Sequence, residues 1–241
     1  MTALLSLDRV SKRFRGLLAV DAVSFDVPEG VIFAVIGPNG AGKTTLFNMI
    51  AGAMTPDDGA IAFAGAPISG LTPDAVCRRG VARTFQLVRP FPALSVEDNV
   101  IVGALLHHRE VGAARERAFA VLRRLDLFDK RHQIAATLTL PDRKRLEVAR
   151  ALATEPKLLL LDEVMAGLRP TETDRMVATL RAINRESGLT ILLIEHVMRA
   201  VMALAARVLV LDHGVAIAAG TPEDVVRDPA VVRSYLGTEA L

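Results

Sequence analysis

Short apolar runs alternate with amphipathic stretches along most of the chain, a pattern typical of an α/β domain. Four runs are almost wholly apolar, which predicts buried strands: Val31–Ile36, Leu158–Leu161, Thr190–Ile194 and Val208–Leu211. Ile61–Phe63 predicts a further short strand. Because strands buried on both faces belong to parallel sheets covered by helices, we expect an α/β core with a mainly parallel sheet.

Several helix starts carry recognisable capping signals. Thr72-Pro73 and Thr221-Pro222 place a capping hydroxyl before proline at the first helical position. Ser95 stands three residues before Asp98, the spacing of a capping box. Gly42–Ala51 predicts a helix directly after the first buried strand. These signals place helices between the predicted strands, as an α/β fold requires.

From Ser95 to about Ala153 the pattern is almost wholly helical, which marks a change in composition inside the chain. Strands return after this stretch, and no repeat or flexible linker separates the parts. We therefore expect one domain over residues 1–241, with a core formed by 1–86 and 154–241 and an inserted helical subdomain formed by 87–153.

Composition and charge narrow the possible partners. The single cysteine, Cys77, excludes an internal disulfide and points to a reducing compartment. The formal net charge is only +2 and no Lys/Arg run occurs, so we expect no nucleic-acid partner. No apolar run approaches the ~20 residues that a membrane-spanning helix needs. We therefore expect a soluble protein that would act at a membrane only through a partner.

One glycine-rich segment carries the clearest chemistry. Gly37-Pro38-Asn39-Gly40-Ala41-Gly42-Lys43-Thr44 matches G-x-x-x-x-G-K-[ST] between a predicted strand and a predicted helix. Glycines let backbone amides turn inward around an anion, and the helix start adds its positive dipole end. The Lys43 ammonium can neutralise the β- and γ-phosphates, and the Thr44 hydroxyl can ligate Mg²⁺. A glycine-rich turn with a surface lysine is the alternative, which this strand–loop–helix context disfavours.

A second signal is the pair of carboxylates that ends the strand at Leu158–Leu161. Asp162 can hold Mg²⁺ through its water shell, and Glu163 can orient and deprotonate an attacking water. Two charges at a strand end are also common where a chain simply enters solvent. Together with the phosphate-binding segment, they predict a site for hydrolysis of a nucleoside triphosphate.

These motifs, in this order, resemble those of ABC-transporter ATPase subunits along nearly the whole chain. The resemblance implies that Gln86 contacts Mg²⁺, that His196 senses the γ-phosphate, and that Phe14 stacks on adenine. Glu163 and His196 are then the catalytic residues. Thr44, Gln86 and Asp162 are the expected metal-binding residues. The expected nucleotide-binding residues are Phe14, Gly37, Asn39, Gly40, Ala41, Gly42, Lys43, Thr44, Thr45 and Gln86.

The resemblance extends to the LivG-type subunits of branched-chain amino-acid importers. The segments that carry it are Gly80–Gln86, Val96–Val100, Ala151–Lys157, Gly220–Glu223 and Tyr235-Leu236-Gly237. It implies an ATP- and Mg²⁺-dependent ATPase that powers uptake of branched-chain amino acids or related small solutes. It also implies a second homologous ATPase subunit in a heterodimer, permease subunits, a solute-binding protein, and a place on the cytoplasmic face of the plasma membrane.

The chain departs from that family at its signature motif, normally Leu-Ser-Gly-Gly-Gln. This position reads Leu138-Thr139-Leu140-Pro141-Asp142, from which Thr139, Leu140 and Asp142 are expected to contact the ATP of the partner subunit. Pro141 removes an amide donor and Asp142 adds a negative charge. Two interpretations stay open: a weakened partner site, or a working variant, since proline is tolerated in a first helical turn.

Arg169 is a second departure, at a position where the family commonly has Asp or Asn. Two other functions are compatible with parts of the pattern. A regulatory half of a heterodimer that binds but does not hydrolyse ATP would explain the altered signature, yet Glu163 and His196 are both present. An ABC protein of DNA repair would need long heptad runs, which the sequence lacks.

Overall fold

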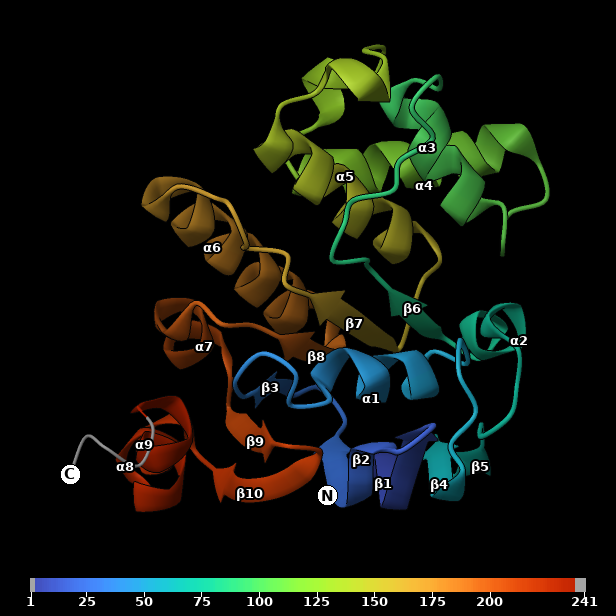
Figure 1. Ribbon diagram of the computed structural model, residues 1–241. Coiled ribbons are helices and arrows are strands. Elements are labelled where there is room, and N and C mark those ends of the chain that lie inside the picture. Colours follow the sequence, from blue (N-terminus) through green and yellow to red (C-terminus); the bar gives the residue numbers. More distant parts are fainter. Residues whose placement is uncertain (1–2, 237–241) are drawn as a thin grey trace.

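The computed structural model describes residues 3–236, and the parallel strands form its central sheet (Figure 1). The strands follow the order β10-β9-β3-β8-β7-β6; all pairings are parallel except that of β10 with β9. Their bounds are β3 Ile32–Ile36, β6 Val81–Arg83, β7 Leu158–Asp162, β8 Thr190–Ile194, β9 Arg207–Asp212 and β10 Val215–Gly220. The predicted α/β class with a mainly parallel sheet is therefore confirmed.

A second, antiparallel sheet is formed mostly by the N-terminal part of the chain. It has the order β2-β1-β4-β5, with β1 Ala3–Phe14, β2 Leu17–Pro28, β4 Asp58–Phe63 and β5 Ala66–Pro67. Leu5 and Leu7 of β1 pair opposite Phe63 and Ile61 of β4, and all four side chains are buried. The expected N-terminal antiparallel subdomain is confirmed, and this sheet supplies one wall of the site described below.

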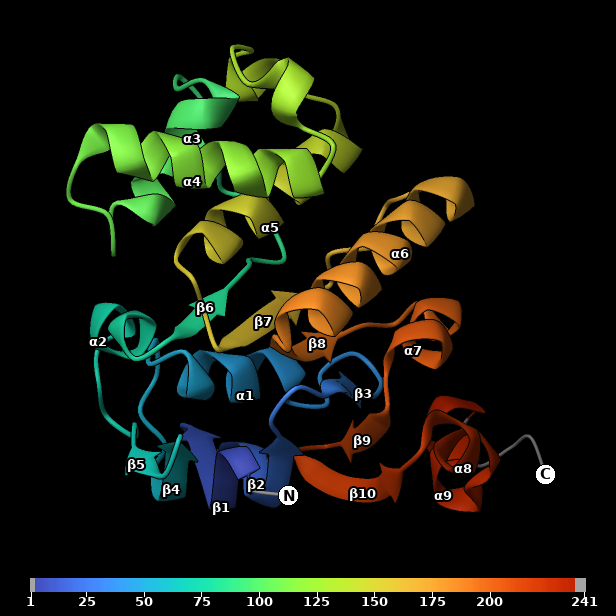
Figure 2. The ribbon, with the colours of Figure 1, turned by 180° about the vertical axis from the view of Figure 1, so that it is seen from behind.

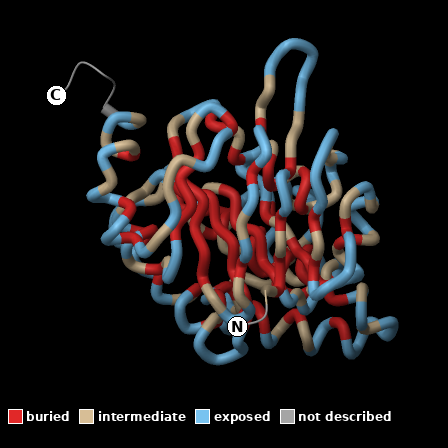
Figure 3. Tube along the Cα trace, turned by 90° about the horizontal axis from the view of Figure 1, so that it is seen from below, coloured by how far each residue is buried: buried red, intermediate tan, exposed pale blue. Residues whose placement is uncertain are grey.

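Helix α1, Lys43–Ile50, lies between the two sheets (Figures 1 and 2). Leu46, Phe47 and Ile50 are fully buried against side chains from both sheets. Every residue of β3, β7 and β8 is buried, because α1 covers one face and other helices cover the opposite face. Figure 3 shows these buried strands gathered in the middle of the molecule with exposed loops around them.

The opposite face carries α6 Pro170–Ser187 and α7 Met198–Leu204, with the inserted helices beyond them (Figure 1). The insertion contains α3 Val96–Ala104, α4 Val111–Arg124, the 3-10 turns η1 Phe128–Lys130 and η2 Ala135–Thr137, and α5 Leu140–Ala153. The Ser95 hydroxyl accepts a hydrogen bond from the Asp98 amide, as the capping spacing predicts. Residues 87–95 form a loop, so the helices of the insertion begin only at Val96.

The remaining helices flank the ends of the two sheets. They are α2 Pro73–Arg78, α8 Pro222–Arg227 and α9 Pro229–Leu236, of which α2 and α8 begin at the prolines that the sequence indicated. Gly237, which contributes to the family resemblance, lies outside the described residues. Within residues 3–236, no helix has the length and apolar character that a bilayer crossing demands.

Candidate nucleotide site

Four strands of the main sheet end at the same edge, and each leads into one part of the site. Gly37 follows β3, and Gln86 follows β6 by a short connection. Asp162 ends β7 with Glu163 directly after it, and His196 follows β8. Ligand sites of parallel α/β sheets form at the carboxyl ends of the strands. Residues far apart in the sequence are thus brought to one edge by the strand order.

The loop between β3 and α1 is shaped by glycines. Gly42 has φ +97°, and a Cβ there would lie 2.3 Å from the Ala19 carbonyl oxygen, so only glycine fits between the loop and β2. The first amides of α1 have no partner within the helix, and they point with its positive dipole end toward the loop. The geometry is that of an anion-binding loop.

Lys43 lies inside this loop, with only 8% of its surface exposed. Its Nζ donates to the carbonyl oxygens of Gly37 and Pro38, at 2.8 Å each. Burial lowers the pKa of Lys43, while the charges of Glu163 and Asp162 oppose that shift. An incoming phosphate would therefore meet a cation that the protein already holds in place.

A cavity of about 360 Å³ opens over the loop. Its size falls in the range of small-molecule sites. Phe14 and Leu17, at the ends of β1 and β2, form one wall and Gln86 and Glu163 the other. Asn39, Gly40, Ala41, Gly42, Lys43, Thr44 and Thr45 form its floor. The structure thus places nearly all the expected nucleotide-binding residues around one cavity; Gly37 instead packs beneath the loop, against the Leu211 carbonyl.

Three residues that the sequence analysis assigned to catalysis or metal binding meet at Glu163 in the polar wall, although His196 does not itself line the cavity. Gln86 Nε2 donates to Glu163 Oε2 at 2.8 Å, and His196 Nδ1 lies 3.8 Å from Glu163 Oε1. Glu163 has φ +49°, a left-handed backbone that is uncommon for a residue with a side chain. Such strained residues concentrate at functional sites.

Asp162 is buried behind this wall, with 1% of its surface exposed. Its Oδ2 accepts a hydrogen bond from Arg83 at 2.9 Å, whereas its buried Oδ1 has no partner among the described residues. Burial raises the pKa of Asp162, and the Arg83 guanidinium opposes that shift. A buried oxygen without a partner fits a role toward a cation and its water shell.

No group of three His, Cys, Asp or Glu residues suited to a metal ion occurs in residues 3–236. A metal at this edge would instead have the Thr44 hydroxyl, the Gln86 amide oxygen, the Asp162 carboxylate and phosphate oxygens around it. Such a set of hard oxygen ligands with few protein groups suits Mg²⁺, which keeps several of its own waters. The residues present therefore fit the predicted ion.

The structure adds residues that the sequence analysis did not single out. Lys144 Nζ donates to the carbonyl oxygens of Gln86 at 3.3 Å and Glu163 at 2.9 Å. Glu195, 1% exposed, accepts from the Met165 amide just beyond Glu163. Burial lowers the pKa of Lys144 and raises that of Glu195. For Glu195 the available signal was a charge directly after the apolar strand Thr190–Ile194, whereas the charged stretch around Lys144 gave none.

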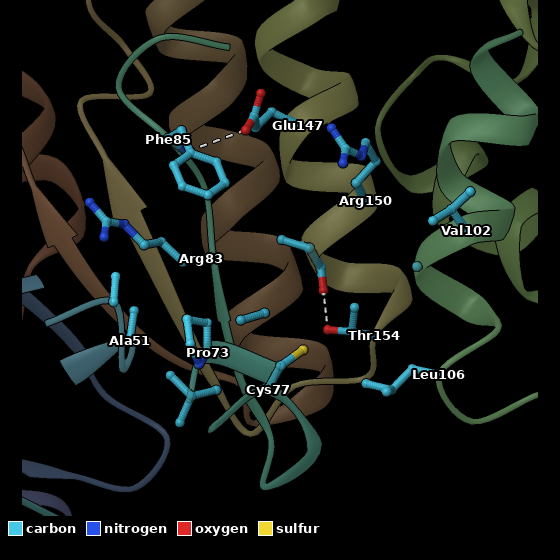
Figure 4. A pocket seen from close by; sticks show the side chains of 15 residues that line it. Ala51, Pro73, Cys77, Arg83, Phe85, Val102, Leu106, Glu147, Arg150 and Thr154 are labelled. Carbon is cyan, nitrogen blue, oxygen red and sulfur yellow. Dashed lines mark hydrogen bonds between the residues drawn. The ribbon is translucent and has the colours of Figure 1, made fainter. Parts of the chain in front are cut away.

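Glu147 belongs to the same helix as Lys144 and holds the chain on either side of Gln86. Its Oε1 accepts from the Phe85 amide and its Oε2 from the Arg89 amide. Figure 4 shows Glu147 reaching from α5 toward Phe85, beside Arg150, in the groove between α5, β6 and α3. Helix α5 therefore fixes the backbone around Gln86 from the outside of the cavity.

The altered signature stands at the start of α5 and does not line the cavity of its own chain. Thr139 is the N-cap, and Leu140 is partly exposed beside Gly167. Asp142 is only 4% exposed, and its Oδ2 accepts from Lys130 and from the Thr139 hydroxyl. Burial opposes ionisation of Asp142, but these donors hold its pKa below the usual range. Its charge is therefore turned inward.

Arg169 lies in the loop before α6, where its amide donates to Glu172 Oε2 at 2.8 Å. Arg169 is exposed, and it is not among the residues that line the cavity. In this single chain, Arg169 therefore contributes to the start of α6 rather than to the nucleotide site.

Comparison with known proteins identifies the class. The sequence profile of the ABC transporter family matches residues 20–166. These residues hold the phosphate-binding loop, Gln86, Asp162 and Glu163. The chain belongs to the ABC transporter family and is an ATPase subunit of that family.

The comparison also narrows the group within the family. A profile for the branched-chain amino acid ATP-binding cassette transporter matches residues 217–240. The chain is 38% identical to the high-affinity branched-chain amino acid transport ATP-binding protein BraF of Pseudomonas aeruginosa, over 97% of this chain and 98% of that protein. It is 39% identical to the corresponding protein LivG of Escherichia coli K12, over the same shares of the two chains. The resemblance to LivG-type subunits is confirmed.

Relatives with other named roles are also similar to this chain over nearly its whole length. The lipopolysaccharide export ATP-binding protein LptB of Escherichia coli K12 is 35% identical over 98% of both chains. Among solved structures, an ATP-binding cassette of an ABC transporter in its ADP conformation matches with a TM-score of 0.89 and 30% identity. That match covers 98% of this chain and 100% of that one. The cassette fold is therefore shared with relatives of different named transport roles.

Proposed function

We propose that the chain binds Mg²⁺-ATP in the cavity over the phosphate-binding loop and hydrolyses it to power import of branched-chain amino acids or related small solutes. The observation that carries this proposal is the shared cavity of Phe14, the 39–45 loop, Gln86 and Glu163. It combines a flat apolar surface for a base, a cationic loop for phosphates and a carboxylate for water. The relatives named for branched-chain amino acid transport support the solute class.

Each residue of the cavity has a defined part in this reaction. Phe14, partly exposed at the rim, stacks on the adenine ring. The amides from Asn39 to Thr45 surround the phosphates, and Lys43 neutralises their charge. Thr44 and Gln86 would hold Mg²⁺ directly and Asp162 would hold it through water, and the ion would supply positive charge for the β- and γ-phosphates.

Residues at the polar wall of the cavity orient and activate the attacking water. Glu163 orients the water and accepts its proton, and Gln86 holds that carboxylate through the 2.8 Å hydrogen bond. His196 lies on the other side of Glu163 and contacts the γ-phosphate. Because Nε2 of Gln86 makes this bond, its amide oxygen would remain available to hold Mg²⁺.

The same site gives reasons to propose partners. The signature residues Thr139, Leu140 and Asp142 lie outside the chain's own cavity, so they serve the ATP of a second homologous subunit. Because the signature here differs from the usual family sequence, we propose that this subunit is a different chain. Permease subunits dock at the groove near Gln86 and Phe91, which places the protein at the cytoplasmic face of the plasma membrane. A solute-binding protein supplies the solute indirectly.

The test compares Glu163→Gln with the native chain, each assayed alone and mixed with the proposed second cassette. We expect the variant to bind a fluorescent ATP analogue with unchanged affinity. We expect its phosphate release to fall by about 10²–10⁴-fold, the usual contribution of a general base. Glu116→Gln, on the exposed face of α4, removes an equivalent charge and is expected to leave turnover unchanged.

Two results would refute parts of this proposal. Unchanged hydrolysis in Glu163→Gln would remove Glu163 from its role, and absence of Mg²⁺-ATP binding by the native chain would refute the nucleotide site itself. For the partner, size exclusion of Glu163→Gln with Mg²⁺-ATP is expected to give a dimer with the second cassette. A stable dimer of this chain alone would instead support identical subunits.

A further inference from the structure

Arg83 has two side-chain partners, the buried Asp162 and the partly buried Asn48, and no part in the proposed chemistry. It ends strand β6, and 10% of its side-chain surface is exposed. One terminal nitrogen, Nη2, lies 2.9 Å from Asp162 Oδ2, and the other, Nη1, lies 2.5 Å from Asn48 Oδ1. The guanidinium therefore joins the end of β7 to the middle of α1.

The position of Arg83 relates three segments that the proposed site depends on. Asn48 belongs to α1, the helix whose first turn carries Thr44. Asp162 ends β7, and Gln86 follows Arg83 by three residues on the connection from β6. One side chain thus ties together the three elements that carry the proposed metal-binding residues Thr44, Gln86 and Asp162.

A neighbouring residue ties β6 to β7 as well. The fully buried Thr84 accepts the Asp162 amide with its hydroxyl, and its own amide donates to the Leu160 carbonyl oxygen. These bonds fix the backbone of Asp162 but leave its carboxylate free to rotate. Figure 4 shows Arg83 at the end of β6 and Phe85 just beyond it, and the centre of the Phe85 ring lies 5.5 Å from the guanidinium carbon.

The ion pair decides how the Asp162 carboxylate is oriented. Arg83 holds Oδ2, while Oδ1 is buried and has no partner in the described part of the chain. A guanidinium can reach two acceptors in fixed directions at once, which a lysine ammonium on a flexible stem does less well. The carboxylate is thus presented with one oxygen engaged and the other free.

We propose that Arg83 is a positioning residue for the metal site: it locks the Asp162 carboxylate so that Oδ1 is presented to Mg²⁺ and its water shell. This inference rests on the proposed Mg²⁺-ATP function. Arg83 itself touches neither nucleotide nor metal. Its loss therefore weakens the part of nucleotide binding that depends on Mg²⁺ and leaves the part that depends on the phosphate-binding loop.

The experiment measures binding of a fluorescent ADP analogue to Arg83→Met, which removes the charge and keeps an apolar stem. Affinity is measured in EDTA and over a Mg²⁺ titration. In EDTA we expect affinity within about threefold of the native chain, because Lys43 and the loop amides are untouched. The Mg²⁺ concentration for half-maximal enhancement is expected to rise at least about tenfold, corresponding to one lost charge-assisted hydrogen bond.

Three further variants separate orientation from folding. Arg83→Lys keeps the charge without the fork and is expected to restore part of the Mg²⁺ response; it replaces Arg83→Met if that variant fails to fold. Asn48→Ala removes only the hydrogen bond between Arg83 and α1, so we expect a smaller rise in the Mg²⁺ concentration for half-maximal enhancement. Arg79→Met removes an exposed arginine from the neighbouring helix end and is expected to behave as the native chain.

The outcomes distinguish this inference from the function on which it rests. If the native chain shows no Mg²⁺-dependent gain in affinity, the proposed Mg²⁺-ATP site fails. If the native chain shows that gain and the folded Arg83 variants show the same Mg²⁺ response, the role of Arg83 is overturned while the site stands. Equal losses of affinity in EDTA and in Mg²⁺ would also overturn it, because they indicate a general loss of structure.

Discussion

The buried carboxylate of Glu147 offers a direct test of how α5 controls the segment that carries Gln86. Glu147 is 5% exposed, and its two oxygens accept from the Arg89 amide at 2.8 Å and the Phe85 amide at 3.3 Å. Arg150, one turn further along α5, donates to the Arg89 carbonyl oxygen. Glu147→Ala removes both carboxylate bonds and leaves the rest of this contact in place.

The expected magnitude follows from these contacts. A hydrogen bond to a charged group contributes about 1.5–3 kcal/mol, so two such bonds set an upper bound near 6 kcal/mol. Two features reduce that value. Phe85 and Arg89 are exposed residues, so water can reach their amides in the variant. Burial also raises the pKa of Glu147, which means that keeping it charged has a cost. We expect a loss of about 1–2 kcal/mol in the free energy of unfolding.

Local opening of the loop is a more sensitive measure than global stability. Hydrogen exchange at the Phe85 and Arg89 amides is expected to speed up by about tenfold or more in Glu147→Ala, with little change in β3 or β8. Glu147→Gln keeps one acceptor oxygen and turns an NH₂ group toward the other amide, so it is expected to fall between the native chain and the alanine variant. Urea unfolding measures the change in the free energy of global unfolding.

The consequence for catalysis follows from the same loop. If its ends are released, Gln86 no longer holds Glu163 at a fixed distance, so turnover is expected to fall while ADP affinity changes little. Unchanged exchange at both amides in Glu147→Ala would show that Arg150 and Lys144 suffice to hold the loop. That result would refute the assignment of this role to Glu147.

Three other predictions concern individual residues. Gly42→Ala places a Cβ 2.3 Å from the Ala19 carbonyl at φ +97°, so fluorescent-nucleotide affinity should fall at least about tenfold, whereas Gly16→Ala, with open space around it, should not change it. Burial raises the pKa of Glu195, so its contribution to folding is full below an ordinary glutamate pKa and is lost as pH rises through the raised value. In urea unfolding, Glu195→Gln should therefore gain stability relative to the native chain as pH rises above the ordinary glutamate pKa, because the native carboxyl must then ionise while buried. Lys144→Met leaves the Gln86 and Glu163 carbonyl oxygens without the Lys144 Nζ donor, so the free energy of unfolding should fall by about 2 kcal/mol. An unchanged melting temperature would contradict a stabilising role of Lys144.

The sequence was most informative where one residue type alone satisfies a local requirement. The glycines and Lys43 of the 37–44 loop, and the apolar strands before them and before Asp162, fixed the expected positions of the sheet edge and the cavity floor. The order of strands was not available from such local patterns. Pairing β3 between β8 and β9 depends on contacts across about 160 to 175 residues of chain, which periodicity does not encode.

The interactions behind the cavity were also beyond reach of the sequence. Arg83 stands beside Thr84-Phe85-Gln86 and reads as part of that motif, yet its contacts are with α1 and β7. Lys144 and Glu147 follow the signature in a charged stretch that resembles an exposed helix face. Only the packing of α5 against the Gln86 segment shows that both side chains are buried.

For the altered signature at 138–142, the sequence left two interpretations open, a weakened partner site and a working variant, and the contacts of Asp142 and Pro141 bear on both. From the sequence, Asp142 places a negative charge where a partner's phosphate is expected, which favours a weakened site. In the fold, that carboxylate is bound by Lys130 and Thr139 and lies 3.5 Å from Arg145, so its charge is compensated within the chain. Pro141 occupies the first turn of α5, where its missing amide breaks no helical bond. These contacts favour a working variant, in which the Thr139–Asp142 bond fixes the helix start that we propose to face the second subunit.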